Sequence, residues 1–325
     1  MDKRKQIIRN WIESLYPDDV FTLESASCDA SFRRYFRLKK QNCSLIIMDA
    51  PPENEEITTF CRLARRFHAL GLNVPEILHT EDESGFVLMS DLGSKHYLDS
   101  LNNNTVEHLY GDAMGSLVTL QAGTFDEPGF LPPYSAELLQ QEMNLFRQWY
   151  LETHLGVDIT DEENRIMDDA WQLLTTSALE QPQLWVHRDY HSRNLMITGI
   201  NNPGIIDFQD AVTGPITYDL VSLLKDCYIE WPAEQVEEWA LGYHGLAFQS
   251  GLLEKEDEQL FLRWFHRMGI QRHLKVAGIF ARLWHRDGKK RYLDDIPLTL
   301  KYLLSALHND PELAELYKLV IAKVS

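Results

Sequence analysis

The sequence predicts an α+β protein built from two lobes, a small β-rich N-terminal lobe and a larger helical C-terminal lobe. Three observations support this prediction. Short runs of β-branched and aromatic residues alternate with turns up to about residue 90. Apolar residues recur at helical spacing from about Thr105 onward. The length of 325 residues also suits two cores better than one minimal domain. We place the lobes at residues 1–92 and 93–325.

The N-terminal lobe is expected to hold most of the strands. In chain order, its expected elements are an amphipathic helix at 7–16, strands at 20–24, 33–39 and 44–49, a helix at about 55–70, and strands at 75–79 and 85–90. Asp91-Leu92-Gly93 then breaks the pattern and marks a hinge. In the helical lobe, short apolar runs indicate a small embedded sheet at 184–186, 195–197 and 205–206.

Composition and charge exclude several classes of protein. Hydrophobic residues make up 44% and charged residues 25%, which is typical of a soluble globular chain. The formal net charge of -18 does not attract nucleic acid or anionic lipid. No apolar run is long enough to span a membrane, and the first residues favour an amphipathic helix over a signal peptide. The four cysteines form no CxxC zinc pair. We expect a cytoplasmic monomer whose partner is a small molecule.

The most informative segment runs from Trp185 to Leu220 and reads WVHRDYHSRNLMITGINNPGIIDFQDAVTGPITYDL. It contains His187-Arg188-Asp189, then Asn194 five residues after the aspartate, and Asp207-Phe208 after a turn. This arrangement matches the catalytic loop of kinases, in which an aspartate and an asparagine precede a second aspartate. A short HxD or DF motif by itself carries little information, but the complete set in a strand–hairpin–strand context is specific.

The residue types suit phosphoryl transfer. Asp189 is placed to accept the proton of an attacking hydroxyl, and Asn194 and Asp207 offer the hard oxygen ligands that Mg²⁺ prefers. A hairpin that turns at 201–204 would bring Asn194 and Asp207 to the same end of two paired strands. Without a cation, Asp189, Asp207 and Asp210 would repel one another. The segment therefore predicts an enzyme that uses ATP and Mg²⁺.

Together with Gly214-Pro215 and Tyr218-Asp219-Leu220, these motifs resemble the aminoglycoside phosphotransferase and choline kinase superfamily over nearly the whole chain. That superfamily shares the protein-kinase-like fold. The resemblance implies that ATP lies between the lobes and that Asp219 is a structural anchor. It also implies an adenine-contacting hinge formed by Met89, Ser90, Asp91 and Leu92.

Five longer phrases resemble a narrower group, the bacterial anomeric amino-sugar kinases, which phosphorylate the C1 hydroxyl of N-acetylmuramate and N-acetylglucosamine during cell-wall recycling. The phrases are DASFRRYFRL (29–38), MDAPPE (48–53), HRDYHSRNLM (187–196), IDFQDAVTGP (206–215) and QRHLKVAGIFARL (271–283).

The predicted phosphate-covering loop departs from the protein-kinase pattern. Residues 25–34 contain no glycine, so the small side chains of Ala30 and Ser31 would have to let the backbone approach the phosphates, with Phe32 beside them.

A second departure concerns the phosphate-binding lysine. On strand alternation, Met48 takes the position that usually holds this lysine. Methionine cannot bind a phosphate, whereas Arg33 or Arg34 could do so through a bidentate guanidinium. The alternative for each arginine is a solvated position on a strand edge.

The acceptor is expected to bind beside Asp189. Arg272, Lys275 and Arg282 recur near helical spacing and form a basic stripe in an acidic chain, which suits an acceptor with a carboxylate. The alternative is a salt-bridged helix face. The candidate acceptor-binding residues are His191, Arg193, Asp210, Arg272 and Lys275.

Three functions remain open at this point. The first is an anomeric amino-sugar kinase, and the second is a kinase for another small hydroxyl acceptor, such as an aminoglycoside or choline. The third is a nucleotide-binding pseudokinase, which the missing lysine and glycines suggest and which the presence of Asp189, Asn194 and Asp207 disfavours.

Overall fold

The computed structural model describes residues 2–27, 33–41, 43–53, 57–125 and 129–324. The chain forms two compact units, of which the first comprises residues 1–95 and 195–209 and the second residues 96–194 and 210–325. The sequence suggested one boundary at residue 92, whereas this division is discontinuous. The hairpin after residue 194 joins the first unit because the Ile197 amide donates to the Lys95 carbonyl at 2.8 Å and the Ile205 amide to the Asn73 carbonyl at 2.7 Å.

The first unit is built on an antiparallel sheet with the strand order β1-β2-β3-β5-β4. Its elements are α1 (Lys3–Leu15), β1 (Thr22–Ser27), β2 (Arg34–Lys39), β3 (Ser44–Asp49), α2 (Ile57–Ala69), β4 (Ile77–Glu81), β5 (Phe86–Ser90) and the hairpin strands β7 (Leu195–Met196) and β8 (Gly204–Ile205). Helix α1 begins earlier than predicted because the Asp2 carboxylate caps it, accepting hydrogen bonds from the amides of Arg4 and Lys5.

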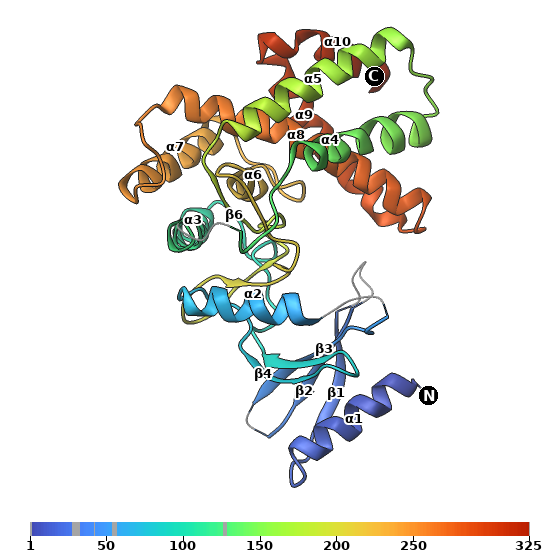
Figure 1. Cartoon of the computed structure of the whole chain (residues 1–325), viewed down its shortest axis with the longest axis vertical. Helices are drawn as coiled ribbons and strands as arrows, with labels where there is room; N and C mark the ends of the chain where they lie inside the picture. The colour runs from blue at the N-terminus through green and yellow to red at the C-terminus, as the bar shows by residue number, and fades with distance from the viewer. Residues whose placement is uncertain (1, 28–32, 42, 54–56, 126–128, 325) are drawn as a thin grey trace. The chain divides into compact units, whose positions relative to one another are not determined.

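Helix α1 covers one face of this sheet (Figure 1). Ile8 and Ile12 are fully buried against Phe36 of β2 and Ile47 of β3. Because successive side chains of a strand point to opposite faces, Asp49 shares this face with Ile47. Its buried carboxylate accepts from the Nε of Arg4 in α1 at 2.8 Å and from the Nε of Arg34 in β2 at 2.9 Å. Asp49 therefore ties helix α1 to the sheet.

Replacing Asp49 with alanine is expected to lower the free energy of unfolding by about 2–3 kcal/mol, since hydrogen bonds to a charged partner are lost. The side chains of Arg4 and Arg34 are 28% and 40% exposed, so they regain water in the variant. Urea unfolding measures the change. The control is Asp2→Asn, which removes an exposed partner of Arg34 but keeps a good helix cap, and it should cost less than about 1 kcal/mol. Equal losses in the two variants would contradict this role of Asp49.

The second unit is mainly helical and packs around α8 (Figure 1). Its elements are α3 (Val106–Gly123), α4 (Ala136–Leu145), the π-helix η1 (Phe146–His154), α5 (Asp161–Leu179), β6 (Gln183–Val186), β9 (Val212–Pro215), α6 (Tyr218–Leu224), α7 (Ala233–Gln249), α8 (Glu258–His285), η2 (Lys290–Asp295), α9 (Ile296–His308), η3 (Pro311–Leu313) and α10 (Ala314–Val324). No helix in the described ranges combines the length and the apolar character needed to cross a bilayer.

Gly278 allows α8 to approach α4 closely. A Cβ atom at this position would lie 2.2 Å from the backbone carbon of Leu145, at the end of α4. Ile270, Leu274, Ala277 and Ala281 lie on the buried part of the same helix and contribute to the main core of the unit. Gly278 thus serves the packing of two helices, which brings α4 next to the buried charged residues of α8.

Candidate active site

The loop from His187 to Asn194 follows strand β6 and is held by two buried carboxylates. The carboxylate of Asp219, at the start of α6, accepts hydrogen bonds from the backbone amides of His187 at 2.6 Å and Arg188 at 3.0 Å. The carboxylate of Asp226 accepts hydrogen bonds from the backbone amide of Ser192 at 2.9 Å and from its hydroxyl at 2.5 Å. Asp219 therefore acts as the loop anchor that the family resemblance implied, and burial raises its pKa to about 7.

Asp189 and Asn194, the predicted base and the predicted metal ligand, are joined within this loop. The backbone carbonyl of Asp189 accepts from the amide of His191 at 3.0 Å and from the side-chain Nδ2 of Asn194 at 3.0 Å. The hydrogen bond fixes the Asn194 amide so that its Oδ1 points away from this carbonyl. The backbone amide of Asn194 also donates to the backbone carbonyl of His191 at 2.9 Å. The loop is thus a closed turn that holds Asp189 and Asn194 next to each other.

A buried charge network lies against the catalytic loop. Glu142 of α4 accepts hydrogen bonds from the Arg188 guanidinium and the Tyr134 hydroxyl, and its carboxylate lies 2.9 Å from the Nζ of Lys275. Arg272 donates from Nη1 to the carbonyl of Arg188 at 2.9 Å. Arg188 has a φ of 75°, which is strained for a residue with a Cβ, and these contacts hold it there.

The network gives Arg272 and Lys275 internal partners. The side chains of both residues are almost fully buried, and both also donate to the Tyr218 hydroxyl, at 3.2 and 2.9 Å. Their predicted contact with an acceptor stays a prediction, whereas the contacts that the structure provides support the loop. Glu142 was missed from the sequence. Its signal was an acid at the spacing of Leu139, Met143 and Phe146 on the apolar face of a helix.

The network also acts on the predicted base. Burial raises the pKa of Asp189, but the combined effect of Lys275, His191 and Arg272, which lower it, is larger. The net pKa therefore lies below the usual value. The carboxylate is therefore ionised at neutral pH and able to accept a proton.

Replacing Lys275 with methionine is expected to raise the pKa of Asp189, because the charge that lowers this pKa most is removed. A base works only when deprotonated, so the acid limb of the kcat/KM profile should move to higher pH. The control is Lys318→Met, which removes an exposed lysine of α10 that is paired with Glu315. An acid limb at the same pH in the Lys275 variant and the wild type would disprove the electrostatic role of Lys275.

The first unit positions Asp207. This residue follows β8 with a φ of 67°, and its Oδ1 accepts from the Nε2 of Gln209 at 3.0 Å. The next residue, Phe208, is fully buried and contacts two rings of α2. It stacks on Phe60 with ring centroids 5.1 Å apart, and the ring of Phe67 lies tilted against it at 5.3 Å. Phe208 therefore fixes the end of the hairpin against α2 and sets the backbone of Asp207.

The sheet face opposite α1 carries the residues predicted to contact the nucleotide. Ile47 and Leu88 face α1, so the alternation of β3 and β5 turns Met48 and Met89 to the other face. Both methionines are buried. Met48 thus lies on the face that strand alternation predicts for it, and this face is apolar and suited to a purine ring.

The two candidate phosphate-binding arginines lie on opposite faces. Arg34 shares the α1 face and is committed to Asp49 and Asp2. Arg33, one residue earlier, is buried, and its guanidinium carbon lies 5.7 Å from the ring centroid of Phe60 in α2. Ala30, Ser31 and Phe32 lie outside the described residues.

The predicted hinge is braced at Asp91. Its carboxylate accepts from Arg37, with Nε at 2.7 Å and Nη2 at 3.1 Å, and from the hydroxyl of Ser44 at 2.5 Å. Burial raises the pKa of Asp91, but the Arg37 and Ser44 hydrogen bonds outweigh it, and the net pKa is lowered. The hydroxyl of Ser90 also braces this segment, since it accepts a hydrogen bond from the backbone amide of Glu76 at 2.9 Å. These bonds hold the backbone that leads through Leu92.

Two further predicted acceptor residues surround Tyr228. The ring of His191 meets it edge-on at 5.4 Å between centroids, and the guanidinium of Arg193 stacks 3.5 Å from its centroid. Asp210 is exposed on the same unit. Trp231 is buried and donates to the Tyr110 hydroxyl at 3.0 Å, so it belongs to the core.

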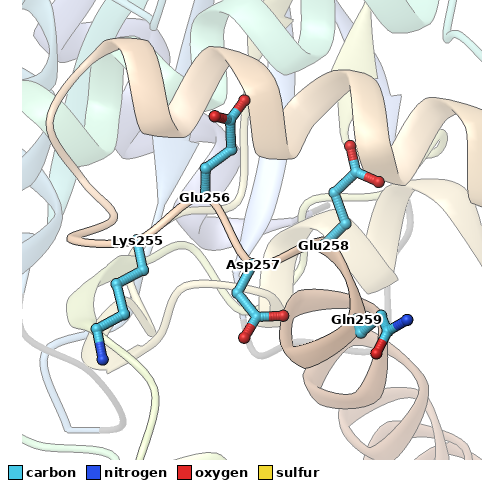
Figure 2. A pocket seen from close by; sticks show the side chains of 5 residues that line it. All are labelled: Lys255, Glu256, Asp257, Glu258 and Gln259. Carbon is cyan, nitrogen blue, oxygen red and sulfur yellow. The ribbon is translucent and has the colours of Figure 1, made fainter.

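A separate surface hollow precedes helix α8 (Figure 2). It contains none of the predicted site residues and is lined by Lys255, Glu256, Asp257, Glu258 and Gln259. Across the described parts of the chain, no three or more His, Cys, Asp or Glu side chains gather in a group that could hold a metal ion.

Comparison with known proteins gives relatives of nearly full length. The model of the phosphotransferase enzyme family matches residues 22–276. The N-acetylmuramate/N-acetylglucosamine kinase of Pseudomonas aeruginosa is 43% identical, over 98% of this chain and 96% of the relative. A protein of the same name from Neisseria meningitidis is 40% identical, over 99% of this chain and 96% of the relative.

Solved structures show the same fold. The choline kinase LicA from Streptococcus pneumoniae superposes with a TM-score of 0.65 at 13% identity, covering 93% of this chain and 99% of that one. An ADP-bound aminoglycoside phosphotransferase gives a TM-score of 0.59 at 15% identity, covering 93% of this chain and 98% of that one. These likenesses confirm the predicted α+β, protein-kinase-like fold class. With a family model matched over most of its length and relatives at 40–43% identity, the chain belongs to the phosphotransferase enzyme family.

Proposed function

We propose that the protein is an ATP-dependent kinase that phosphorylates the anomeric hydroxyl of an N-acetylated amino sugar, N-acetylmuramate or N-acetylglucosamine, in cell-wall recycling. The observation that carries the proposal is the catalytic loop, in which the side chain of Asn194 is bonded to the backbone carbonyl of Asp189. Relatives of nearly full length carry the name N-acetylmuramate/N-acetylglucosamine kinase. The phosphotransferase family and the fold both support a small-molecule kinase.

Asp189 acts as the base for the sugar hydroxyl. Phosphoryl transfer requires the acceptor oxygen to be held in line with the γ-phosphorus, and little covalent chemistry is asked of the protein. An anomeric hydroxyl is more acidic than an ordinary alcohol, so Asp189 has less proton transfer to drive. Its lowered pKa keeps it in the accepting form.

Asn194 and Asp207 would hold Mg²⁺. Their donor atoms are an amide oxygen and a carboxylate, which are the hard ligands that this ion prefers together with phosphate oxygens. The observation that fits them to the ion is the Asn194 amide, whose nitrogen is bonded to the Asp189 carbonyl and whose oxygen therefore points away from it. Bound Mg²⁺ would neutralise part of the charge of the transferring phosphates.

The nucleotide would lie on the sheet face that carries Met48 and Met89. The segment Met89–Leu92 would contact the adenine, and the backbone of Ala30, Ser31 and Phe32 would approach the phosphates. Arg33 is the better candidate than Arg34 to replace the missing lysine, because Arg34 is bound to Asp49 on the α1 face.

Replacing Arg33 with alanine is expected to raise the KM for ATP and lower kcat/KM about 10–100-fold, since a charge-assisted contact with phosphate is lost. The matched variant, Arg34→Ala, should change stability more than catalysis because Arg34 pairs with Asp49. Steady-state kinetics with varied ATP separates the two. A larger kinetic defect in the Arg34 variant would reverse the assignment.

An ADP-release assay with a panel of acceptors tests the proposed function. We expect turnover with N-acetylglucosamine and N-acetylmuramate, and strong rejection of glucose, because a site that hydrogen-bonds the N-acetyl group leaves polar groups unpaired when it is missing. Turnover with choline or an aminoglycoside alone would leave only the general kinase assignment. No turnover with any acceptor would favour the pseudokinase.

A further inference from the structure

Arg193 has an unusual environment for an arginine so close to a catalytic base. It lies four residues after Asp189 in the same closed loop. Its guanidinium stacks on the ring of Tyr228 at 3.5 Å, which fixes the plane of the group. Its side chain is 42% exposed, and among the described residues it makes no hydrogen bond. The edge of the guanidinium, where its donors lie, is therefore available to a ligand.

The one ion pair of Arg193 found among the described residues is weak. The Oδ2 of Asp295, at the end of η2, lies 4.0 Å from Nη2, which is too far for a hydrogen bond. Burial raises the pKa of Asp295 and the charge of Arg193 lowers it, but the neighbouring Asp294 and Asp226 also raise it, so the net pKa lies above the usual value. Asp295 thus lies near Arg193 without satisfying its donors.

Two other cations of this unit that were candidates for binding an acceptor carboxylate are less suitable. Arg272 and Lys275 are buried and already bonded to Arg188, Glu142 and Tyr218. Taking either from these partners would leave a buried charge unpaired, which is costly. Arg193 can change partner without that cost.

The two proposed acceptors differ in the charge that Arg193 would meet. N-acetylmuramate is N-acetylglucosamine with a lactyl ether, and the lactyl group ends in a carboxylate. A planar guanidinium with a free edge binds a carboxylate bidentately. We propose that Arg193 binds the lactyl carboxylate and so sets the preference for N-acetylmuramate over N-acetylglucosamine, with Asp295 as the competing anion that moderates this preference. The proposal rests on the proposed function.

The test is the ratio of kcat/KM for N-acetylmuramate to kcat/KM for N-acetylglucosamine. Arg193→Gln should lower this ratio about 10–100-fold, the value of a hydrogen-bonded charge pair. Asp295→Asn should raise the ratio, because the competing anion is removed. Arg286→Gln is the matched control, since this exposed arginine beyond α8 is paired with Asp287, and it should leave the ratio unchanged.

The methyl ester of N-acetylmuramate separates charge from shape. The ester keeps the lactyl group but has no carboxylate, so Arg193→Gln should change its kcat/KM relative to N-acetylglucosamine by less than about twofold. An equal loss with ester and acid would overturn the proposal, because the arginine would then act by shape alone.

The outcomes distinguish this proposal from the function on which it rests. If the wild type turns over neither sugar, the proposed function fails. If it turns over both and the ratio in Arg193→Gln equals that of the wild type, only the assignment of Arg193 fails. If Arg193→Gln does not fold, Asp295→Asn carries the test, and an unchanged or lower ratio in that variant overturns the proposal.

Discussion

Asp189→Asn is expected to lower kcat by about 10²–10⁴-fold with little change in the KM for ATP. Asparagine has nearly the same shape and keeps the backbone carbonyl that accepts from His191 and Asn194. It cannot accept the proton of the sugar hydroxyl. The loss should therefore appear in the chemical step, and single-turnover measurements at saturating ATP detect it.

The control for Asp189→Asn is Asp168→Asn, which neutralises an exposed carboxylate of α5 that pairs with Arg147. This variant should have the wild-type kcat. Turnover of Asp189→Asn within a few-fold of the wild type, in protein with an unchanged melting temperature, would show that Asp189 is not the base.

Asp207→Asn is expected to lower kcat/KM by about 10³-fold or more and to raise the Mg²⁺ concentration needed for half-maximal activity. A carboxylate ligand contributes several kcal/mol through the charge of the ion it holds, and each 1.36 kcal/mol is tenfold in rate. Asparagine is preferred to alanine because Asp207 has a φ of 67°, a conformation that asparagine tolerates better. Titration with Mg²⁺ at fixed ATP measures the shift.

The control for Asp207 is Asp82→Asn, an exposed residue in the turn that leads to β5, which should leave the Mg²⁺ dependence unchanged. The same half-maximal Mg²⁺ concentration in Asp207→Asn and the wild type would remove Asp207 from the metal site.

The elements of the first unit could be predicted because their signals are local. The β-branched and aromatic residues of 33–39 and 44–49 predict the strands that the structure shows as β2 and β3. The helix expected at 55–70 spans Ile57–Ala69. The start of α1 was placed too late, because the signal there is a single capping residue, Asp2, with no apolar periodicity.

The catalytic loop could be predicted because its residues lie within one short segment. The charges that support it come from distant parts of the chain. Glu142 lies in α4, and Lys275 and Arg272 lie in α8. A sequence shows that these residues are charged but not which of them meet, so both an acceptor-binding stripe and a salt-bridged helix face fit Arg272 and Lys275 on the sequence alone. Nothing local distinguishes a buried ion pair from an open basic stripe.

Strand alternation places two neighbouring arginines, which the sequence alone does not distinguish, on opposite faces of the sheet. Arg33 and Arg34 have the same chemistry, and only the faces of β2 distinguish them. Asp49, which holds Arg34, was not recognised because its role depends on α1 packing on the same face. The family resemblance did not depend on such pairings, and relatives of nearly full length confirm it.

The position of the transferred phosphate distinguishes an anomeric sugar kinase from a kinase for any other hydroxyl. The purified protein is incubated with ATP, Mg²⁺ and either N-acetylglucosamine or its C1 methyl ether, and the product is analysed by NMR. We expect a sugar 1-phosphate from the free sugar, identified by coupling between phosphorus and the anomeric proton, and no product from the methyl ether. Phosphorylation of the methyl ether, or a phosphate on any other hydroxyl of the free sugar, would contradict this expectation.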